Sequence, residues 1–195
     1  MSFIPFEIGN YYHIYNRGNN KDLIFIEKEN YYYFLRLMKK YLAPIADVYS
    51  YCLIPNHFHL ILKIKDKNEL PDAIISLKTK LHQPFSNMFN TYTKAINKRY
   101  NRKGSLFQEH LKRKLIKNEE YLINLITYIN TNPTKHEIGD FSTYEFSSYK
   151  ALISKKPTLL KREETIELFN DIENFKYVCC QNKINLELIK ELLIE

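Results

Sequence analysis

The order of strand-like and helix-like patterns limits the fold of this chain more than any other feature of its sequence. Runs of aromatic and β-branched residues predict strands, and apolar residues spaced three and four apart predict helices. Up to about residue 131 the order is strand, helix, strand, strand, helix, strand, helix. The predicted strands cover residues 11–17, 45–52, 57–65 and about 110–116, and the predicted helices 29–42, 71–81 continuing over 85–97, and 119–131. Residues 23–26 could extend or re-pair the first strand.

This order is that of the split βαβ, or ferredoxin-like, arrangement. We therefore expect an α+β protein with a central antiparallel sheet, helices on one face, and the other face left free for a ligand or a partner. From about residue 147 the pattern changes, with a linker-like stretch at 155–157 and short helices predicted over 163–169 and 186–194. The chain should thus consist of a main domain over residues 1–150 and a small helical C-terminal appendage over residues 151–195.

Positive charge is concentrated in one stretch of the chain. The net charge is +7, and residues 94–117 hold nine lysines and arginines against one glutamate, Glu109, so the rest of the chain sums to about −1. A concentrated basic zone is typical of a polyanion partner, because lysine and arginine neutralise phosphates and release counterions. The alternative is a solvated basic loop on an ordinary protein.

Other sequence features exclude several classes of protein. No run of about 18 apolar residues would suit a membrane span, and the N-terminus lacks the pattern of a signal peptide, so we expect a cytoplasmic protein. Three cysteines without metal-like spacing argue against a disulfide framework or a zinc site. We interpret Cys52 as a buried thiol, and Cys179 and Cys180 as core residues.

The segment Pro55-Asn56-His57-Phe58-His59 carries the first chemical signal. Residues two apart in a strand point to the same face, so His57 and His59 should present their imidazoles side by side while Phe58 packs on the opposite face. Two such imidazoles can hold a divalent cation together with a third ligand. The same pattern also occurs in exposed strand histidines without a role.

The second signal is the pair Tyr128 and Asn132, which share a helix face because they are four residues apart. A phenolic oxygen can form a covalent intermediate, and an asparagine can offer a cation its carbonyl oxygen. Packing is the simpler role for one of 16 tyrosines. Phosphoryl transfer, however, needs a cation to polarise the phosphate and a nucleophile in line with it, and the two signals together would supply both.

Four blocks of sequence, in one order, resemble a known family. They are YCLIPNHFHLIL, GSLFQEHLKRKLI, YLINLITYINTNPTKHEI and EFSSY, preceded by the opening YHIYNRGNNKDLIF. These blocks resemble the single-tyrosine HUH transposases, and among them the REP-associated tyrosine transposases. The resemblance covers roughly residues 10–150.

The resemblance implies a role for each matched residue. His57 and His59 match the paired metal-binding histidines, and Tyr128 matches the nucleophile that forms a 5′-phosphotyrosine link and frees a 3′-hydroxyl. Asn132 matches the third polar ligand, a position that is often Gln in relatives. The cation would be Mg²⁺ or Mn²⁺. The substrate would be single-stranded DNA, often beside small hairpins, and the protein would act as a monomer or a homodimer.

Further residues are weaker candidates. Those for phosphate contacts are Arg17, Arg102, Lys103, Lys112, Arg113 and Lys114, and strand alternation places Arg113 on the face opposite Lys112 and Lys114. Tyr100 and Phe107 could stack on bases, although a core role suits Phe107 better. Tyr121 is the rival nucleophile. The remaining histidines are interpreted as structural or surface residues: His13, His82, His110 and His136.

Two alternatives to DNA strand cleavage stay open. A sheet with basic loops could bind RNA or DNA without cutting it, although the aromatic strand motif of RNP-type domains is lacking here. The chain could also be a transposase that has lost or changed its activity.

Overall fold

The computed structural model describes residues 4–109, 111–181 and 184–185. Four strands form one antiparallel sheet in the order β2-β3-β1-β4. Their bounds are β1 Tyr11–Arg17, β2 Ala46–Ile54, β3 His57–Ile64 and β4 Lys112–Ile116. This order confirms the predicted ferredoxin-like, α+β arrangement, and the strands begin and end close to their predicted bounds.

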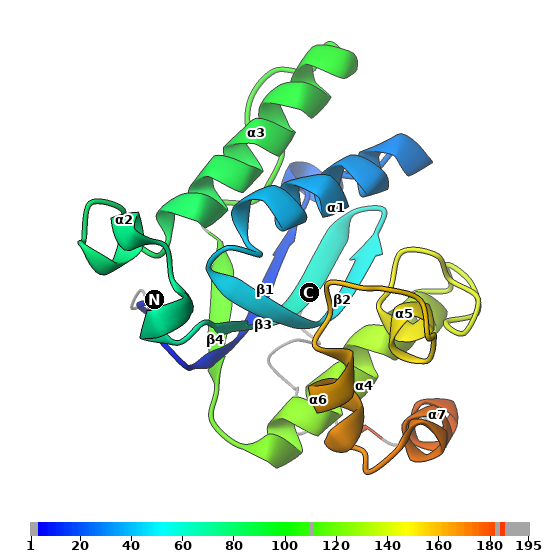
Figure 1. The fold of residues 1–195 in the computed structure, drawn as a ribbon. Helices are drawn as coiled ribbons and strands as arrows, with labels where there is room; N and C mark the ends of the chain where they lie inside the picture. The colour runs from blue at the N-terminus through cyan, green and yellow to red at the C-terminus, as the bar shows by residue number, and fades with distance from the viewer. Residues whose placement is uncertain (1–3, 110, 182–183, 186–195) are drawn as a thin grey trace.

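Helices α1 (Lys28–Tyr41) and α3 (Gln83–Arg99) pack together on one face of the sheet (Figure 1). A capping box formed by Glu27 and Asn30 starts α1 and satisfies backbone N–H groups of its first turn. Phe58 of β3 is fully buried between these helices, with its ring stacked on Phe89 and 5.1 Å from that of Phe34. This aromatic cluster fixes which face of β3 points toward α1 and α3.

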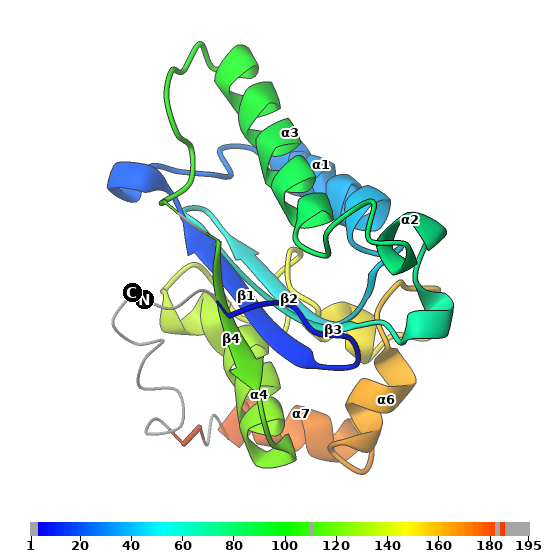
Figure 2. The same ribbon diagram turned by 90° about the vertical axis from the view of Figure 1, so that its left-hand side faces the viewer.

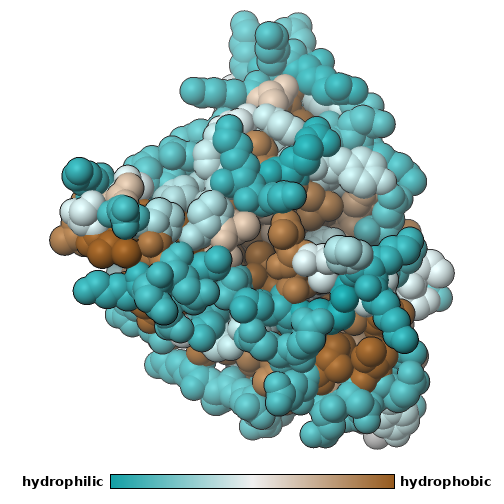
Figure 3. All heavy atoms as spheres, viewed as in Figure 1, coloured by the Kyte–Doolittle hydropathy of each residue, from teal (hydrophilic) through white to brown (hydrophobic). Residues whose placement is uncertain are grey.

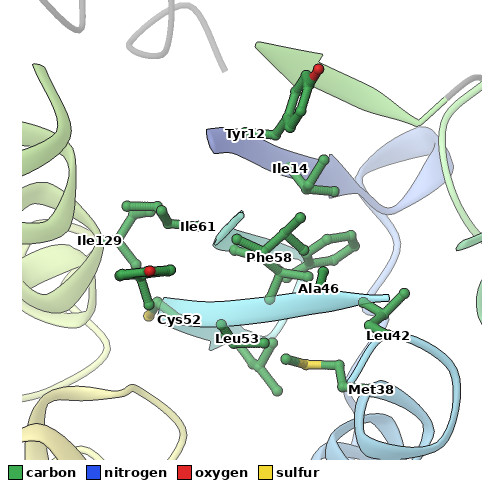
Figure 4. Packing of buried hydrophobic residues seen from close by; sticks show 14 of the residues in the cluster. Tyr12, Ile14, Met38, Leu42, Ala46, Cys52, Leu53, Phe58, Ile61 and Ile129 are labelled. Atoms are coloured by element: carbon green, nitrogen blue, oxygen red, sulfur yellow. The ribbon is translucent and has the colours of Figure 1, made fainter. Parts of the chain in front are cut away.

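The opposite face of the sheet is covered as well, and the expectation of a free face is wrong. Helix α4 (Glu119–Lys135) lies across that face, as Figure 2 shows. Its apolar stripe, with Leu125 and Ile129 fully buried, needs a partner surface. Ile61 and Cys52 of the sheet lie beside Ile129 and provide it (Figure 4).

The ends of α4 follow the prediction at one terminus only. Asn118 caps the helix, since its side chain accepts a hydrogen bond from the Tyr121 N–H at 2.8 Å. The predicted end near Thr131 is wrong, because the helix continues through Pro133 to Lys135. Proline removes one backbone donor, but Asn132 and Pro133 are both buried, and their packing offsets that loss.

The segments between the main elements depart further from prediction. Of the helix predicted over 71–81, only α2 (Asp72–Ile75) forms. Ile74 is its single buried residue, and so short a helix depends on tertiary packing. Figure 3 shows the resulting apolar patch over α2, where Ile75 and Leu77 are exposed. Residues 23–26 form no strand, because the N–H groups of Ile24 and Phe25 both bond to the Pro55 carbonyl.

Three short helices follow α4 along the chain: α5 (Tyr149–Leu152), α6 (Arg162–Glu167) and α7 (Ile172–Gln181). The predicted helix over 163–169 corresponds to α6, α5 and α7 were not predicted, and the helix predicted over 186–194 lies outside the described residues. Cys179 is buried as expected, whereas Cys180 is exposed. No helix in the described ranges has the length and apolar character needed to cross a bilayer.

Candidate active site

The two histidines of β3 lie on the face of the sheet that α4 covers, as strand alternation predicts. Their ring centroids are 5.1 Å apart, and the rings are almost perpendicular at 89°. Phe58 between them points to the other face, toward α1 and α3. His57 pairs with Arg17 across the β1–β3 register, so an arginine of β1 lies beside the histidine pair.

Helix α4 brings Tyr128 and Asn132 to these histidines. The ring of Tyr128 is 5.8 Å from that of His59, at an interplanar angle of 81°. Asn132 lies one turn further along α4 and is fully buried. Within the described ranges, neither its amide nitrogen nor its amide oxygen has a hydrogen bond of ordinary geometry. The structure therefore gathers all four residues that the sequence suggested for catalysis and cation binding.

Burial keeps both imidazoles neutral. Desolvation, reinforced by His136, lowers the pKa of His57 to about 3, although the nearby Asn132 amide raises it in part. Desolvation also lowers the pKa of His59 well below its ordinary value, with a further contribution from His13. A neutral imidazole is the form that binds a cation, because its unprotonated nitrogen carries the lone pair.

Hydrogen bonds determine which nitrogen of each ring is available. Nδ1 of His57 is 2.8 Å from Oδ1 of Asn56 and donates to it, so its proton lies on Nδ1. Nδ1 of His59 is 3.0 Å from Nε2 of His13. Nε2 of His59 is buried without a hydrogen-bond partner in the described residues. Both histidines thus have Nδ1 engaged, and Nε2 of His59 is left for another ligand.

These donors fit a divalent cation of the kind that accepts both nitrogen and oxygen ligands. No group of three histidine, cysteine or carboxylate side chains among the described residues could hold a metal ion. A cation here would therefore use the two imidazoles together with an oxygen, and the buried Asn132 amide, which forms no hydrogen bond of ordinary geometry in the described residues, offers one. Buried polar atoms without a hydrogen bond are rare and call for an explanation; a ligand site is one.

Two residues at the C-terminal end of α4 also adjoin the site. The ring of His136 is 4.7 Å from that of His57, and Nζ of Lys135 lies 4.6 Å from the ring centroid of Tyr128. Burial lowers the pKa of Lys135 to about 8. Sequence reasoning missed Lys135, although its position seven residues after Tyr128 places it on the same helix face.

The rival tyrosine, Tyr121, lies at the other end of α4. It precedes Tyr128 by seven residues, which is roughly 10 Å along a helix axis. Its ring lies 5.3 Å from Nζ of Lys114 on β4. Of the two tyrosines, Tyr128 is the one whose ring contacts the histidine pair among the described residues.

The candidate phosphate-binding residues divide between the two sides of the sheet. Lys112 and Lys114 pair with Tyr15 and His13 of β1 and so lie on the histidine face with Arg17. Arg113 lies on the other face, with its guanidinium 4.2 Å from the ring centroid of Phe6.

The two basic residues after α3 lie in the loop that follows the helix. Arg102 forms an ion pair with Asp22, and Lys103 is exposed. The two aromatic candidates for base stacking also have contacts within the protein. Phe107 is buried in the core, and the hydroxyl of Tyr100 bonds to Glu27 and Asn30.

No protein-family model and no curated protein matches this chain by sequence. A solved structure described as a REP-associated tyrosine transposase bound to a REP hairpin is similar in fold, with a TM-score of 0.58 and 15% sequence identity. The match covers 80% of this chain and 87% of the other. At that identity the likeness establishes the fold alone: the chain is folded like a REP-associated tyrosine transposase.

Proposed function

We propose that this protein cleaves single-stranded DNA and transfers the cut strand through a covalent link to Tyr128, as a transposase does. One observation carries the proposal: the Tyr128 ring meets His59 in a buried group that also holds His57 and Asn132. Nε2 of His59 and the Asn132 amide, which form no hydrogen bond of ordinary geometry in the described residues, support a ligand in this buried group. The structural neighbour, a tyrosine transposase bound to a REP hairpin, supports a nucleic-acid partner.

In the proposed reaction, Oη of Tyr128 gives up its proton and attacks the scissile phosphorus. The bond from phosphorus to the 3′ oxygen breaks, and that oxygen takes a proton and leaves as a 3′-hydroxyl. The 5′ phosphate remains on Tyr128. Attack by water then breaks the link to Oη and gives a nicked strand, whereas attack by the 3′-hydroxyl of a second strand gives strand transfer.

The cation in this scheme is Mg²⁺ or Mn²⁺, and His57, His59 and Asn132 would hold it. When bound, it would polarise the scissile phosphate and stabilise the charge that develops there. The neutral imidazoles leave lone pairs for such a ligand. Asn132 would add the oxygen that Mg²⁺ prefers.

The histidine face also offers positive charge for the DNA backbone. Arg17, Lys112 and Lys114 lie on this face and are the candidates for phosphates near the cut. Arg102, Lys103 and Arg113 lie elsewhere, and we assign them to more distant parts of the substrate, such as a hairpin. Contacts of this kind would give binding that weakens steeply with salt.

A strand-cleavage assay with two tyrosine variants tests the proposal. Labelled single-stranded DNA, with and without REP-type hairpins, is incubated with the protein and Mn²⁺. We expect Tyr128→Phe to abolish cleavage, because it removes only the nucleophilic oxygen and keeps the packed ring. The matched variant Tyr121→Phe should retain cleavage. Loss of cleavage in Tyr121→Phe alone would move the nucleophile to the other end of α4.

The low exposure of Tyr128, at 4%, favours a second candidate function. A substrate phosphate must reach the Tyr128 hydroxyl, and a closed site suits a protein that binds single strands without cutting them. Such a repurposed transposase would bind DNA equally well in EDTA and Mn²⁺, and neither tyrosine variant would change that binding.

A further inference from the structure

His13 of β1 is a buried histidine that the proposed reaction does not use. Its side chain is completely inaccessible, and its ring lies nearly parallel to that of His59, at 14° and a centroid distance of 5.2 Å. Nε2 of His13 is 3.0 Å from Nδ1 of His59. The hydrogen bond therefore joins the central strands β1 and β3 directly behind the candidate cation site.

We propose that His13 is a positioning residue: by accepting a hydrogen bond from Nδ1 of His59, it keeps the proton of His59 away from Nε2 and so leaves Nε2 able to bind a divalent cation. This inference rests on the proposed function and deepens it, because it assigns the tautomer of a cation ligand to a specific partner.

The hydrogen bond between the two rings allows two arrangements of protons. In the first, His59 donates from Nδ1, and its Nε2 keeps the lone pair. In the second, His13 donates from Nε2, so the proton of His59 must be on its Nε2, where a cation could not bind. Outer partners of metal-binding histidines commonly fix the tautomer and the ring orientation in this way.

His13 can accept this bond only as a neutral ring, because an imidazolium has two donors and no acceptor. Its surroundings favour the neutral ring. It is buried between strands, and its partner across the β1–β4 register is Lys114, a positive side chain. A second proton on His13 would therefore face both desolvation and the charge of that lysine.

The cost of placing a histidine here argues for a function beyond packing. Nδ1 of His13 is buried without a hydrogen-bond partner in the described residues. Leaving such a group unsatisfied costs free energy, and a role beyond packing would explain why the position carries a histidine. His57 receives a comparable restraint from Asn56, so each histidine of the pair has its own outer partner.

Three proteins test the inference: the wild type, His13→Phe, which removes the acceptor, and His13→Gln, which keeps a side-chain acceptor of similar reach. Affinity for Mn²⁺ is measured by calorimetry. We expect His13→Phe to weaken Mn²⁺ binding about 10- to 100-fold, the usual effect of losing an outer partner, and His13→Gln to retain most of the affinity. Unfolding temperature and single-stranded DNA binding, both measured in EDTA, should stay near the wild-type values in both variants.

A second readout needs no variant. Nitrogen NMR of ¹⁵N-histidine-labelled wild-type protein, with Mg²⁺ as the diamagnetic cation, reports which nitrogen of His59 holds the proton. We expect Nδ1. A proton on Nε2 overturns the inference, even if His13→Phe proves unable to fold.

The remaining outcomes separate the inference from the proposed function. Wild-type affinity for Mn²⁺ in His13→Phe overturns the inference while strand cleavage by the wild type still stands. Failure of the wild type to bind Mn²⁺ also overturns it, whatever the cleavage assay shows. The proposed function depends instead on whether DNA becomes covalently linked to Tyr128.

Discussion

At the scale of single residues, the candidate site contains polar atoms that are buried without a hydrogen bond of ordinary geometry in the described ranges. Nε2 of His59 and the amide of Asn132 form no hydrogen bond of ordinary geometry in the described ranges, although burying such a group lowers the free energy of unfolding. Such groups persist where a ligand completes them. The spacing of the histidines and of Tyr128 with Asn132 could be read from the sequence, because strand and helix periods are local.

Replacing His57 by alanine should abolish cleavage and leave DNA binding nearly unchanged. The reason is that His57 is proposed to hold the cation, while lysine and arginine side chains are proposed to contact the phosphates of the DNA. Cleavage is measured with Mn²⁺, and binding by fluorescence anisotropy in EDTA. His82→Ala, which changes a histidine at the start of α3, is the control and should cut normally. If His57→Ala still cuts when Mg²⁺ is in excess, the cation assignment fails.

Two other contacts at the residue scale could not be predicted. His13 and His59 are 46 residues apart, so their hydrogen bond depends on the register of β1 against β3. Lys135 lies beyond Pro133, where the helix was expected to have ended. Sequence periodicity identifies faces within one element, but it does not identify which residues meet across two.

At the scale of elements, α4 connects the core to the candidate site. Asn130 and Asn132 are both fully buried on this helix, yet they differ in hydrogen bonding. The Asn130 side chain bonds to Ser50, Ser148 and the Ile126 carbonyl. The first asparagine therefore joins α4 to β2, and the second is the one that we propose as a cation ligand.

Leucine substitutions at these two asparagines should have opposite effects on stability. Asn132→Leu removes an unsatisfied group and should keep or raise the free energy of unfolding while weakening Mn²⁺ binding. Asn130→Leu should lower the free energy of unfolding by about 2–4 kcal/mol, because Ser50 and Ser148 lose a buried partner. Urea unfolding in EDTA measures both. A large loss of stability in Asn132→Leu would assign that residue to the structure instead of to a ligand.

The elements that were predicted well are those with long and regular patterns. β1 is rich in tyrosine and β3 in leucine and isoleucine, and the apolar stripe of α4 runs from Leu122 to Ile129. The helix expected over 71–81 failed because a pattern of apolar residues does not show whether a neighbouring surface exists to bury them. The short helices α5 and α7 were missed for the same reason, since they depend on packing more than on local preference.

At the scale of the whole molecule, the C-terminal segment packs against the sheet and α4. Residues 147 and 160 form isolated bridges with β2, and they lie against its outer edge. Phe175 of α7 is fully buried, with its ring 5.5 Å from that of Tyr149. Whether residues 1–150 and 151–195 are separate folding units stays a prediction.

Ending the chain at residue 153 tests that division. Among the described residues, the shortened protein loses four buried apolar side chains, Leu160, Phe169, Phe175 and Cys179. Each large one contributes about 1.5–3 kcal/mol, so the loss is a large part of a typical stability of roughly 5–15 kcal/mol. We expect a much lower unfolding temperature or no cooperative unfolding by circular dichroism. An unchanged unfolding temperature would show that the appendage is an independent unit.

Two point variants calibrate that result. Phe175→Ala should lower the free energy of unfolding by about 3–5 kcal/mol, as expected for a large buried ring. Tyr177→Ala changes a side chain that is 57% exposed on the same helix, and should stay within about 0.5 kcal/mol of the wild type. Equal effects of the two variants would contradict the packing described for α7.

The central claim is that Tyr128 becomes covalently linked to DNA. Mass spectrometry of the protein after incubation with single-stranded DNA and Mn²⁺, wild type beside Tyr128→Phe, tests it most directly. We predict a nucleotide adduct on the peptide that contains Tyr128, present in the wild type and absent from the variant. DNA bound without an adduct on any substrate, or an adduct on another tyrosine that persists in Tyr128→Phe, would contradict the claim.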